Sequence, residues 1–524
     1  MEQSKLYKRV LMWFRSDLRL HDNPALSLAL AQSEEVVPVF ILDDALLRHD
    51  PLAGSARVLF MLDCLRDLHQ NLQHCGSYLV LRYASPLTAI EQLLGETQAE
   101  AVFYNQDVDR SYGLERDQAL RHHLTTVRHP PLAFIAVQQY AVWQPNTIGS
   151  LQDQADYPRW HAEWKQKWRE WNAQKLAPTP TKLTTPSGIA TAIHTLPSEP
   201  KAALALLGVA DLEQVGQVGG ESVALTLFAN FLARKLPRYY FSVSYPAAVD
   251  ENEASSLLSP HLKFGSISGR WCIQQCARLL KQAKVEADEN AQTFEAAGNS
   301  NSGNFLTSAE RTSLERFITR LRWREQMYQS LYRYPQAEFE EVAAVFRKVR
   351  RPAVGPEWEA FVSGMTGYPM VDAGVRCLRR TGTLAFRIRA TLASFVCYGL
   401  FMEPQAGKDF FHQYLIDSNP VNWWQWQIQA GTIDYTRFFQ IFNPTVQARK
   451  FDPRGRFIKK WVPELAKVPL DVLSEPWRLS LPEQYELGCV IGRDYPARII
   501  DWRKARQQAL RQLDPLRLSL LKQE

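Results

Sequence analysis

Five short apolar runs in the first 140 residues, separated by helical patterns, constrain the fold of this chain most. The runs span 9–14, 36–42, 78–83, 100–105 and 133–138. Between them, apolar residues recur with the period of a helix over 25–33, 55–74, 86–95 and 113–124. Strands that alternate with helices form a parallel sheet with helices on its faces. The pattern predicts an α/β N-terminal domain with a doubly wound, Rossmann-like sheet.

The loop after the first strand narrows the choice of ligand. No glycine-rich fingerprint follows this strand, so the sequence indicates neither a nicotinamide site nor a P-loop. Instead it reads FRSDLRLHDNPAL from Phe14 to Leu26. Asn23 and Pro24 predict the start of the next helix, because asparagine caps helices and proline fits their first turn.

The remaining residues divide into two further parts. A chain of 524 residues is too long for one hydrophobic core, and 46% apolar residues indicate a globular protein. Residues 140–221 combine a tryptophan stripe with the proline-rich piece LAPTPTKLTTPSG, and residues 222–524 read as helical. We therefore predict a domain over 1–139, an interdomain linker over 140–221 and a larger helical domain over 222–524. The polar segment 295–304 predicts a mobile loop.

Two features of the sequence indicate the cellular compartment of the protein. Charged residues interrupt every apolar run, and they occupy the part of the N-terminus where a signal peptide needs its apolar region. The seven cysteines show no paired spacing, which is typical of a reducing compartment. We expect a cytoplasmic protein without a membrane segment. We predict no metal site, because Cys272 and Cys276 lack a second pair and are expected to be buried in a helix.

The net charge of +6 is mild, but basic residues gather in the C-terminal half. If these residues share a face, they can neutralise phosphates, and otherwise they form a solvated surface. The sequence leaves both interpretations open. The residues are Arg316, Arg320, Arg322, Arg324, Arg347, Lys348, Arg350, Arg351, Arg379, Arg380, Arg449 and Lys450.

Charges inside an apolar pattern point to a cofactor pocket between 366 and 451. Arg387 and Arg389 interrupt an apolar helix, and Asp417 follows the next apolar stretch. Buried charges are costly unless they are paired or bound to a ligand. The pattern predicts an ion pair of Arg389 with Asp417 beside a polar cofactor. Trp423, Trp424 and Trp426 follow and would serve as walls or as electron carriers.

Several long motifs, in the same order, resemble the photolyase/cryptochrome family. They are TGYPMVDA, the helix with the two arginines, LID, WQWQ, IFNPTVQARKFDPRGRFIKKWVPEL and the FRSDLR opening. The resemblance implies an all-α C-terminal domain that binds FAD. It also implies a DNA partner, damaged or single-stranded, and we expect a monomer. Departures from the usual motifs point to a divergent bacterial branch.

The resemblance assigns cofactor-binding residues. Ser255, Ser256, Leu258 and Ser259 match the segment that binds the flavin diphosphate, and a preceding aromatic contact falls on Tyr239 or Tyr240. The Arg389–Asp417 pair matches the ion pair near the reactive edge of the ring, and Arg324 and Arg387 join the set. The loop after Asp417 is shorter than in standard repair enzymes. Asn419 and Asn422 are therefore the candidates for the residue that faces the central flavin nitrogen.

The resemblance also defines catalytic candidates. Trp323 and Trp426 match the two walls that hold a flipped pyrimidine dimer, and Trp424 matches the tryptophan nearest the flavin. Arg320 stands where the family has a glutamate that contacts the dimer. Ala390 replaces a methionine, and Phe386 and Ala390 replace the histidines of the (6-4) branch, which disfavours the (6-4) reaction.

Two expected features of the family are altered. The family's chain of three tryptophans for photoreduction is incomplete. Pro404 stands at its middle position and the distal position falls near Arg351, and neither residue can be oxidised. Trp423, Trp426 or Tyr398 would have to supply a detour. In relatives, the N-terminal domain can hold an antenna chromophore. Arg110 stands where the folate-type site has a glutamate, so a second chromophore remains unidentified and a folate is disfavoured.

Three functions follow from this sequence. The leading prediction is a blue-light-driven photolyase, a carbon–carbon lyase, in which reduced flavin donates an electron to a cyclobutane pyrimidine dimer. The alternative is a cryptochrome-type photoreceptor that binds DNA with little or no repair. The third is a flavoprotein that binds nucleic acid without photochemistry.

Overall fold

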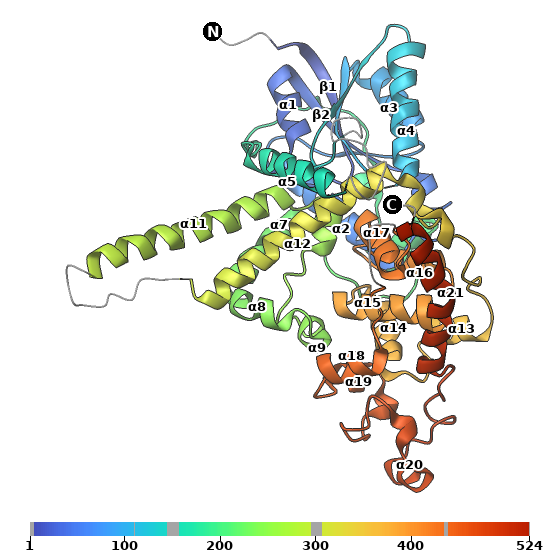
Figure 1. The fold of residues 1–524 in the computed structure, drawn as a ribbon. Coiled ribbons are helices and arrows are strands. Elements are labelled where there is room, and N and C mark those ends of the chain that lie inside the picture. The colour runs from blue at the N-terminus through green and yellow to red at the C-terminus, as the bar shows by residue number, and fades with distance from the viewer. Residues whose placement is uncertain (1–4, 109, 144–156, 295–305, 434–438, 523–524) are drawn as a thin grey trace.

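A computed structural model describes residues 5–108, 110–143, 157–294, 306–433 and 439–522 (Figure 1). The segment 295–304, predicted to be a mobile loop, lies outside these ranges. Within them, none of the helices is long and apolar enough to cross a membrane.

The N-terminal domain contains one parallel sheet, as predicted. Its strands are β1 (Tyr7–Phe14), β2 (Ser33–Leu42), β3 (Val80–Tyr83), β4 (Ala101–Asn105) and β5 (Ala133–Val137). Their order is β3-β2-β1-β4-β5. The order reverses at β1, and in such sheets ligands bind beyond the carboxyl ends of the strands near the reversal.

Helices cover both faces of this sheet. They are α1 (Pro24–Gln32), α2 (Ser55–His74), α3 (Pro86–Thr97) and α4 (Ser111–His122). Val10 and Met12 of β1 pack in one core with α1 and α2, while Leu11 and Trp13 pack in another with α3 and α4. This alternation follows from the two-residue period of a strand. The side chain of Asn23 accepts a hydrogen bond from the Leu26 amide at 3.1 Å, so the predicted helix cap is confirmed.

The chain from 183 to 191 runs along the β3 edge of the sheet. The Val36 amide donates to the Thr184 carbonyl at 2.9 Å. The Thr191 hydroxyl accepts from the Leu81 amide at 2.9 Å and donates to the Leu79 carbonyl at 2.8 Å. The proline-rich segment therefore satisfies backbone groups that an uncovered edge strand would expose.

The described residues from 222 onward are mostly helical, as predicted, and two helices, α5 (Tyr157–Ala173) and α6 (Pro200–Leu207), lie in the predicted linker (Figure 1). The remaining helices are α7 (Glu221–Asn230), α8 (Leu236–Ser242), α9 (Pro246–Asp250), α10 (Ser259–Phe264), α11 (Gly269–Phe294), α12 (Ser308–Arg333), α13 (Pro356–Val362), α14 (Pro369–Thr381), α15 (Phe386–Ser394), α16 (Pro404–Tyr414), α17 (Pro420–Ala430), α18 (Pro444–Phe451), α19 (Arg456–Trp461), α20 (Leu481–Leu487) and α21 (Trp502–Lys522). Figure 1 shows α11 and α12 extending away from the body of the molecule.

The tryptophan stripe of α5 is part of a hydrophobic core. Trp160, Trp164, Trp168 and Trp171 are all buried, and they pack in one cluster with Phe228 of α7. This confirms that the spacing of three and four residues marks a packed helix face.

The loop between β1 and α1 joins the two domains. Asp22 pairs with Arg270 of α11 at 2.6 Å and accepts a hydrogen bond from the Ser268 hydroxyl at 2.5 Å. The ring of His21 contacts the Glu221 carboxylate at 2.5 Å. These side chains are buried, so the domain interface depends on fixed polar partners.

We predict that Asp22→Asn destabilises the protein by about 3 kcal/mol at pH 7, because it leaves the buried Arg270 without its carboxylate. Asparagine keeps the size of the side chain and tolerates the positive φ of 41° at this position. The free energy of unfolding, measured with urea, checks this. The exposed Asp471→Asn change is the control and should stay within about 0.5 kcal/mol.

The difference between wild type and Asp22→Asn should depend on pH. Burial alone would raise the pKa of Asp22. The hydrogen bond from Arg270 and the charges of Arg19 and Arg270 lower this pKa by more than burial raises it, so the net shift is downward. A lowered folded-state pKa gives stability that is present above the unfolded pKa of about 4 and is lost as pH falls through the folded value. A difference that persists unchanged in strong acid would contradict this assignment.

Candidate functional site

Two cavities meet inside the helical domain. The inner cavity, about 240 Å³, is lined by residues that include Ser255, Ser256 and Asp417. The outer cavity, about 280 Å³, is lined by residues that include Trp323 and Trp426. Both are also lined by Arg320, Arg324, Arg389 and Asn422, so the two cavities join at these side chains.

One face of α12 forms a wall of the site. Arg316, Arg320, Trp323, Arg324 and Met327 follow one another at spacings of three and four residues and all line the outer cavity. This is the spacing of neighbours on one helix face. A capping box of Thr307 and Glu310 fixes the start of the helix.

The opposite wall comes from α15 and α17. Asn419 caps α17, because its side chain accepts a hydrogen bond from the Val421 amide at 2.9 Å. The side-chain oxygen Oδ1 of Asn422 accepts from the backbone N–H of Asn419 at 3.0 Å. Both asparagines line the inner cavity. Their oxygens are thus used by the helix start, and their amide groups are the parts left to act as donors to a ligand.

The ion pair expected between Arg389 and Asp417 is confirmed. The Arg389 Nη2 lies 2.9 Å from Asp417 Oδ2, and its Nε donates to the Leu384 carbonyl at 2.8 Å. Asp417 Oδ1 is buried and has no hydrogen-bond partner among the described residues. Leaving a buried carboxylate oxygen without a hydrogen-bond donor is costly, so we expect a bound ligand to supply the donor.

A strained turn carries the serines of the inner cavity. The Ser255 oxygen accepts from the Leu257 amide at 3.2 Å, and the Ser256 oxygen accepts from the Leu258 amide at 3.4 Å. Leu257, which follows the two serines, has a φ of 57°, a left-handed conformation that costs a non-glycine residue about 1–2 kcal/mol. Such strain is typical of ligand sites, and the hydroxyl protons remain able to donate to an anion.

The other residues predicted to bind the cofactor have clear positions. Leu258, Ser259 and Tyr239 line the inner cavity. Tyr239 is buried, whereas Tyr240 is exposed, so the structure favours Tyr239 as the aromatic contact. Arg387 lines only the outer cavity. Arg324 is partly buried and donates from Nη2 to the Leu262 carbonyl at 2.7 Å.

These residues fit FAD. The serine turn and the arginines offer donors to a diphosphate, and the free oxygen of Asp417 accepts from an N–H group such as those of a flavin or an adenine. The ion pair places a guanidinium beside the same space, which would stabilise negative charge on a reduced ring. The fit rests on this donor and acceptor set.

The two predicted lesion walls line the same outer cavity. Trp323 projects from α12 and is 46% exposed, while Trp426 projects from α17 and is buried. The Trp426 ring packs edge-on to Phe411 at 5.0 Å. A Cβ atom at Gly407 would lie 2.3 Å from this indole, so a glycine is required there. One wall is therefore rigid and the other is accessible.

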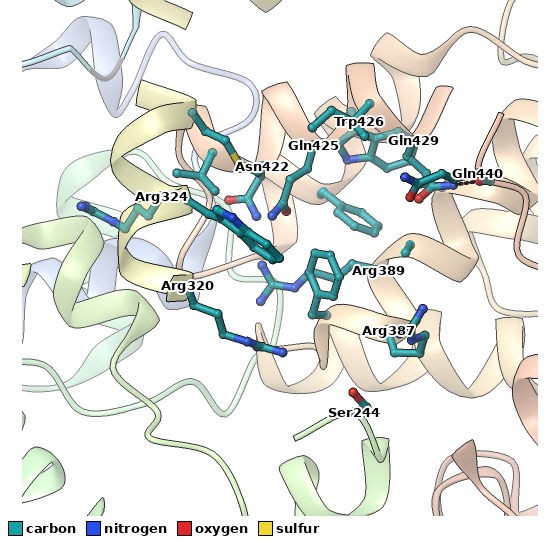
Figure 2. A pocket seen from close by; sticks show the side chains of 18 of the residues that line it. Ser244, Arg320, Arg324, Arg387, Arg389, Asn422, Gln425, Trp426, Gln429 and Gln440 are labelled. Atoms are coloured by element: carbon teal, nitrogen blue, oxygen red, sulfur yellow. Dashed lines mark hydrogen bonds between the residues drawn. The ribbon is translucent and has the colours of Figure 1, made fainter. Parts of the chain in front are cut away.

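Figure 2 shows polar side chains from several elements that line the outer cavity. Asn422, Gln425 and Gln429 come from α17, Arg320 and Arg324 from α12, and Arg387 and Arg389 from α15. From the sequence we did not assign Gln425, Gln429, Arg316 or Ser244 to this site, although Arg316 belongs to the basic residues that could neutralise phosphates. The first three lie three or four residues from predicted site residues, so the helical period could have found them. Ser244 follows α8 in a loop, and no pattern marks it.

Trp424 points away from both cavities. Its ring stacks on Tyr334 at 6.0 Å and lies in a cluster with Trp423 and Ile433, on the other side of α17. Its role as the tryptophan nearest the flavin stays a prediction. Pro404 is buried at the start of α16, and Arg351 is exposed.

The C-terminal arginines do not form one basic face. Arg350 is buried and donates from Nη2 to the Ala430 carbonyl at 2.7 Å. Arg379 and Arg380 donate to the carbonyls of Val362 and Glu213. The interpretation that all these residues share one phosphate-binding surface is therefore wrong, because several of their guanidinium groups donate hydrogen bonds to backbone carbonyls. Arg316, Arg320 and Arg387 do face the outer cavity, as described above.

A third cavity, about 170 Å³, lies at the carboxyl ends of β1 and β2, and we call it the sheet-edge cavity. Its lining includes Trp13, Phe40, Arg57 and Lys263. Burial lowers the pKa of Lys263 to about 7 and that of Arg57 to about 10. Arg110 also lines it, but its guanidinium pairs with Asp50 at 2.6 Å and with Glu338 at 3.2 Å.

Among the described residues, no group of histidine, cysteine, aspartate and glutamate side chains could hold a metal ion. Cys272 and Cys276 are buried in α11, as expected.

The fold and cavities define a two-domain protein with an internal site for an anionic dinucleotide cofactor. Residues 317–515 match the family model for the FAD binding domain of DNA photolyase, and residues 10–185 match the model for DNA photolyase. The chain therefore belongs to the photolyase/cryptochrome family, and its helical domain is of the FAD-binding type.

Individual relatives agree with this. The chain is 30% identical to a deoxyribodipyrimidine photo-lyase of Synechococcus sp., over 94% of this chain and 93% of that protein. It is also 30% identical to a cryptochrome DASH of Gloeobacter violaceus, over the same two shares. A solved bacterial class III photolyase from Agrobacterium tumefaciens has a TM-score of 0.78 at 27% identity and covers 98% of both chains.

We predict that Asp417→Asn weakens FAD binding roughly tenfold or more, since a charge-assisted hydrogen bond is worth about 1.5–3 kcal/mol. The dissociation constant, obtained by titrating flavin-depleted protein with FAD, measures the effect. Circular dichroism should show an intact fold. The exposed Asp514→Asn change is the control. Equal affinities for the wild type and Asp417→Asn would show that Asp417 does not face the flavin.

Proposed function

We propose that the protein is a blue-light-driven DNA photolyase that repairs cyclobutane pyrimidine dimers, with damaged or single-stranded DNA as its substrate. The observation that supports this most is that Trp323 and Trp426 line one cavity, which joins the cavity of the Arg389–Asp417 pair. Bound FAD would supply light absorption and the single-electron transfer that opens the cyclobutane ring.

The outer cavity suits a flipped pyrimidine pair. Trp426 offers a fixed apolar surface, and Trp323 covers the other side from α12, so bases can stack on aromatic rings outside the duplex. The side-chain NH2 group of Asn422 can donate to base carbonyls, and the Gln425 amide can donate to carbonyls and accept from N–H groups of the bases. Arg320 can donate to carbonyls or to a phosphate but cannot accept a hydrogen bond, which differs from the carboxylate expected at this position.

A cryptochrome-type photoreceptor is the second candidate. Pro404 and Arg351 interrupt the route expected for photoreduction, and Arg320 alters the contact expected for a dimer. A cryptochrome DASH among the relatives is consistent with this candidate. A receptor would change its proteolysis pattern or its oligomeric state on illumination, whereas a repair enzyme need not.

We infer that a second chromophore binds in the sheet-edge cavity. Arg57 gives this cavity positive charge, and Trp13 and Phe40 give it aromatic walls, a combination that suits a flat anionic ring system. Arg110 has no acceptor to replace the carboxylate of a folate-type site, and its own donors are used by Asp50 and Glu338.

We also propose a monomeric, cytoplasmic protein with domains at 1–139 and 222–524 joined by a linker at 140–221. The described cysteines are free thiols, most of them buried, which suits a reducing compartment. Sedimentation of the purified protein tests the monomer.

We predict that Trp323→Ala weakens binding of a dimer-containing oligonucleotide about 5- to 100-fold, because base–aromatic stacking is worth about 1–3 kcal/mol. The ring is half exposed, so the fold should be kept. Binding in the dark and repair under blue light are both measured. Trp323→Phe should restore most of the affinity, and the exposed Tyr485→Ala change on α20 is the control. Normal affinity and repair in Trp323→Ala would contradict the proposed lesion wall.

A further inference from the structure

Exposed aromatic rings gather around the outer cavity. Eight large aromatic side chains are exposed within the described ranges, and five of them belong to this region. Trp323 and Phe386 line the cavity. The other three lie on or next to α8, beside Ser244 and Arg316, which also line it. The five are Tyr240, Phe241, Tyr245, Trp323 and Phe386.

Helix α8 presents a pair of rings to solvent. Tyr240 is 41% and Phe241 is 61% exposed, and their ring centroids are 5.1 Å apart. The guanidinium of Arg316 lies 5.8 Å from the Tyr240 ring centroid. Arg238 is exposed and precedes Phe241 by three residues, so it lies on the same face of the helix. Apolar rings of this size rarely stay in water without a ligand when they occur as a group.

The same region carries positive charge without matching carboxylates. Within the part of the chain that the structure describes, Arg316, Arg320 and Arg387 form no ion pair with an acidic side chain. Burial lowers the pKa of Arg387, and the charges of Arg320 and Arg316 lower it further. In Figure 2, Arg320, Arg387 and Ser244 lie on the same side of the cavity. Three guanidinium groups that repel one another favour a bound polyanion.

We propose that Arg238, Tyr240, Phe241 and Arg316 form a platform for single-stranded DNA next to the outer cavity. This platform rests on the proposed function, because it would hold the unpaired nucleotides beside the one inside the cavity. Bases would stack on Tyr240 and Phe241, and Arg238 and Arg316 would contact phosphates. In a duplex the base faces are stacked on each other, so duplex DNA can use the arginines but not the rings.

The test is a Tyr240→Ala/Phe241→Ala double variant, assayed in the dark with undamaged oligonucleotides. Fluorescence anisotropy should show roughly 5- to 30-fold weaker binding of a single strand. Duplex binding should change less than about twofold, since it depends on phosphate contacts. An oligonucleotide that lacks bases over the bound segment should bind wild type and variant alike. The Tyr485→Ala variant, exposed on α20 far from this region in Figure 1, should behave as wild type.

A second variant separates stacking from charge. Arg316→Gln should reduce the slope of log K against log salt by about 0.7 for single strands, which is the value for one lost phosphate contact. An RNA strand of the same sequence is measured as well. If wild type binds it as tightly as the DNA strand, and the double variant loses the same affinity for both, the platform stands and its ligand is any single-stranded nucleic acid. Equal losses for single strand and duplex, or no loss, would overturn the proposal.

These outcomes are independent of repair. If the wild type repairs dimers but the double variant binds single strands with normal affinity, the platform is contradicted and the photolyase function is not. Wild type that prefers single strands through these rings but repairs no dimer would contradict the photolyase function alone. Circular dichroism of each variant confirms that the fold is kept.

Discussion

The ion pair between the partly buried Arg389 and the buried Asp417 determines how the rest of the site is arranged. It joins α15 to the loop before α17, and these two helices form the wall opposite α12. The Leu384 carbonyl orients Arg389, and one oxygen of Asp417 is left for a ligand. A largely buried pair of this kind contributes little to stability by itself, but losing one partner is costly. Its position between the two cavities suits a role in holding an anionic ring.

The domains depend on each other through a second group of buried charges. Asp22 and His21 lie in the loop after β1 and contact Arg270 and Glu221 of the helical domain. Gly265 is needed at this interface, because a Cβ atom there would lie 2.1 Å from the Ser16 carbonyl. The loop that resembles the family's opening motif therefore connects the two domains through buried polar contacts. The sheet-edge cavity borders it, so a chromophore there would contact both domains.

The sequence predicted what local patterns and charge pairing determine. The five strands, the helix cap at Asn23 and the Arg389–Asp417 pair follow from apolar periods and from the cost of burying charge. Side-chain direction does not follow from these patterns. Trp424 and Trp426 are two residues apart on α17, so they point to different sides, and only Trp426 reaches a cavity. The surface around Phe241 depends on how α8 packs on α12, which no sequence period reveals.

The most direct test of the photolyase function uses flavin-loaded wild-type protein and an oligonucleotide with one thymine cyclobutane dimer. The remaining dimer is counted by chromatography after illumination with blue light and after the same time in the dark. The account predicts that dimers disappear in the light, with many turnovers per protein, and persist in the dark. Protein that holds reduced flavin and binds the dimer, yet leaves it intact under blue light, would contradict the photolyase function and favour the photoreceptor.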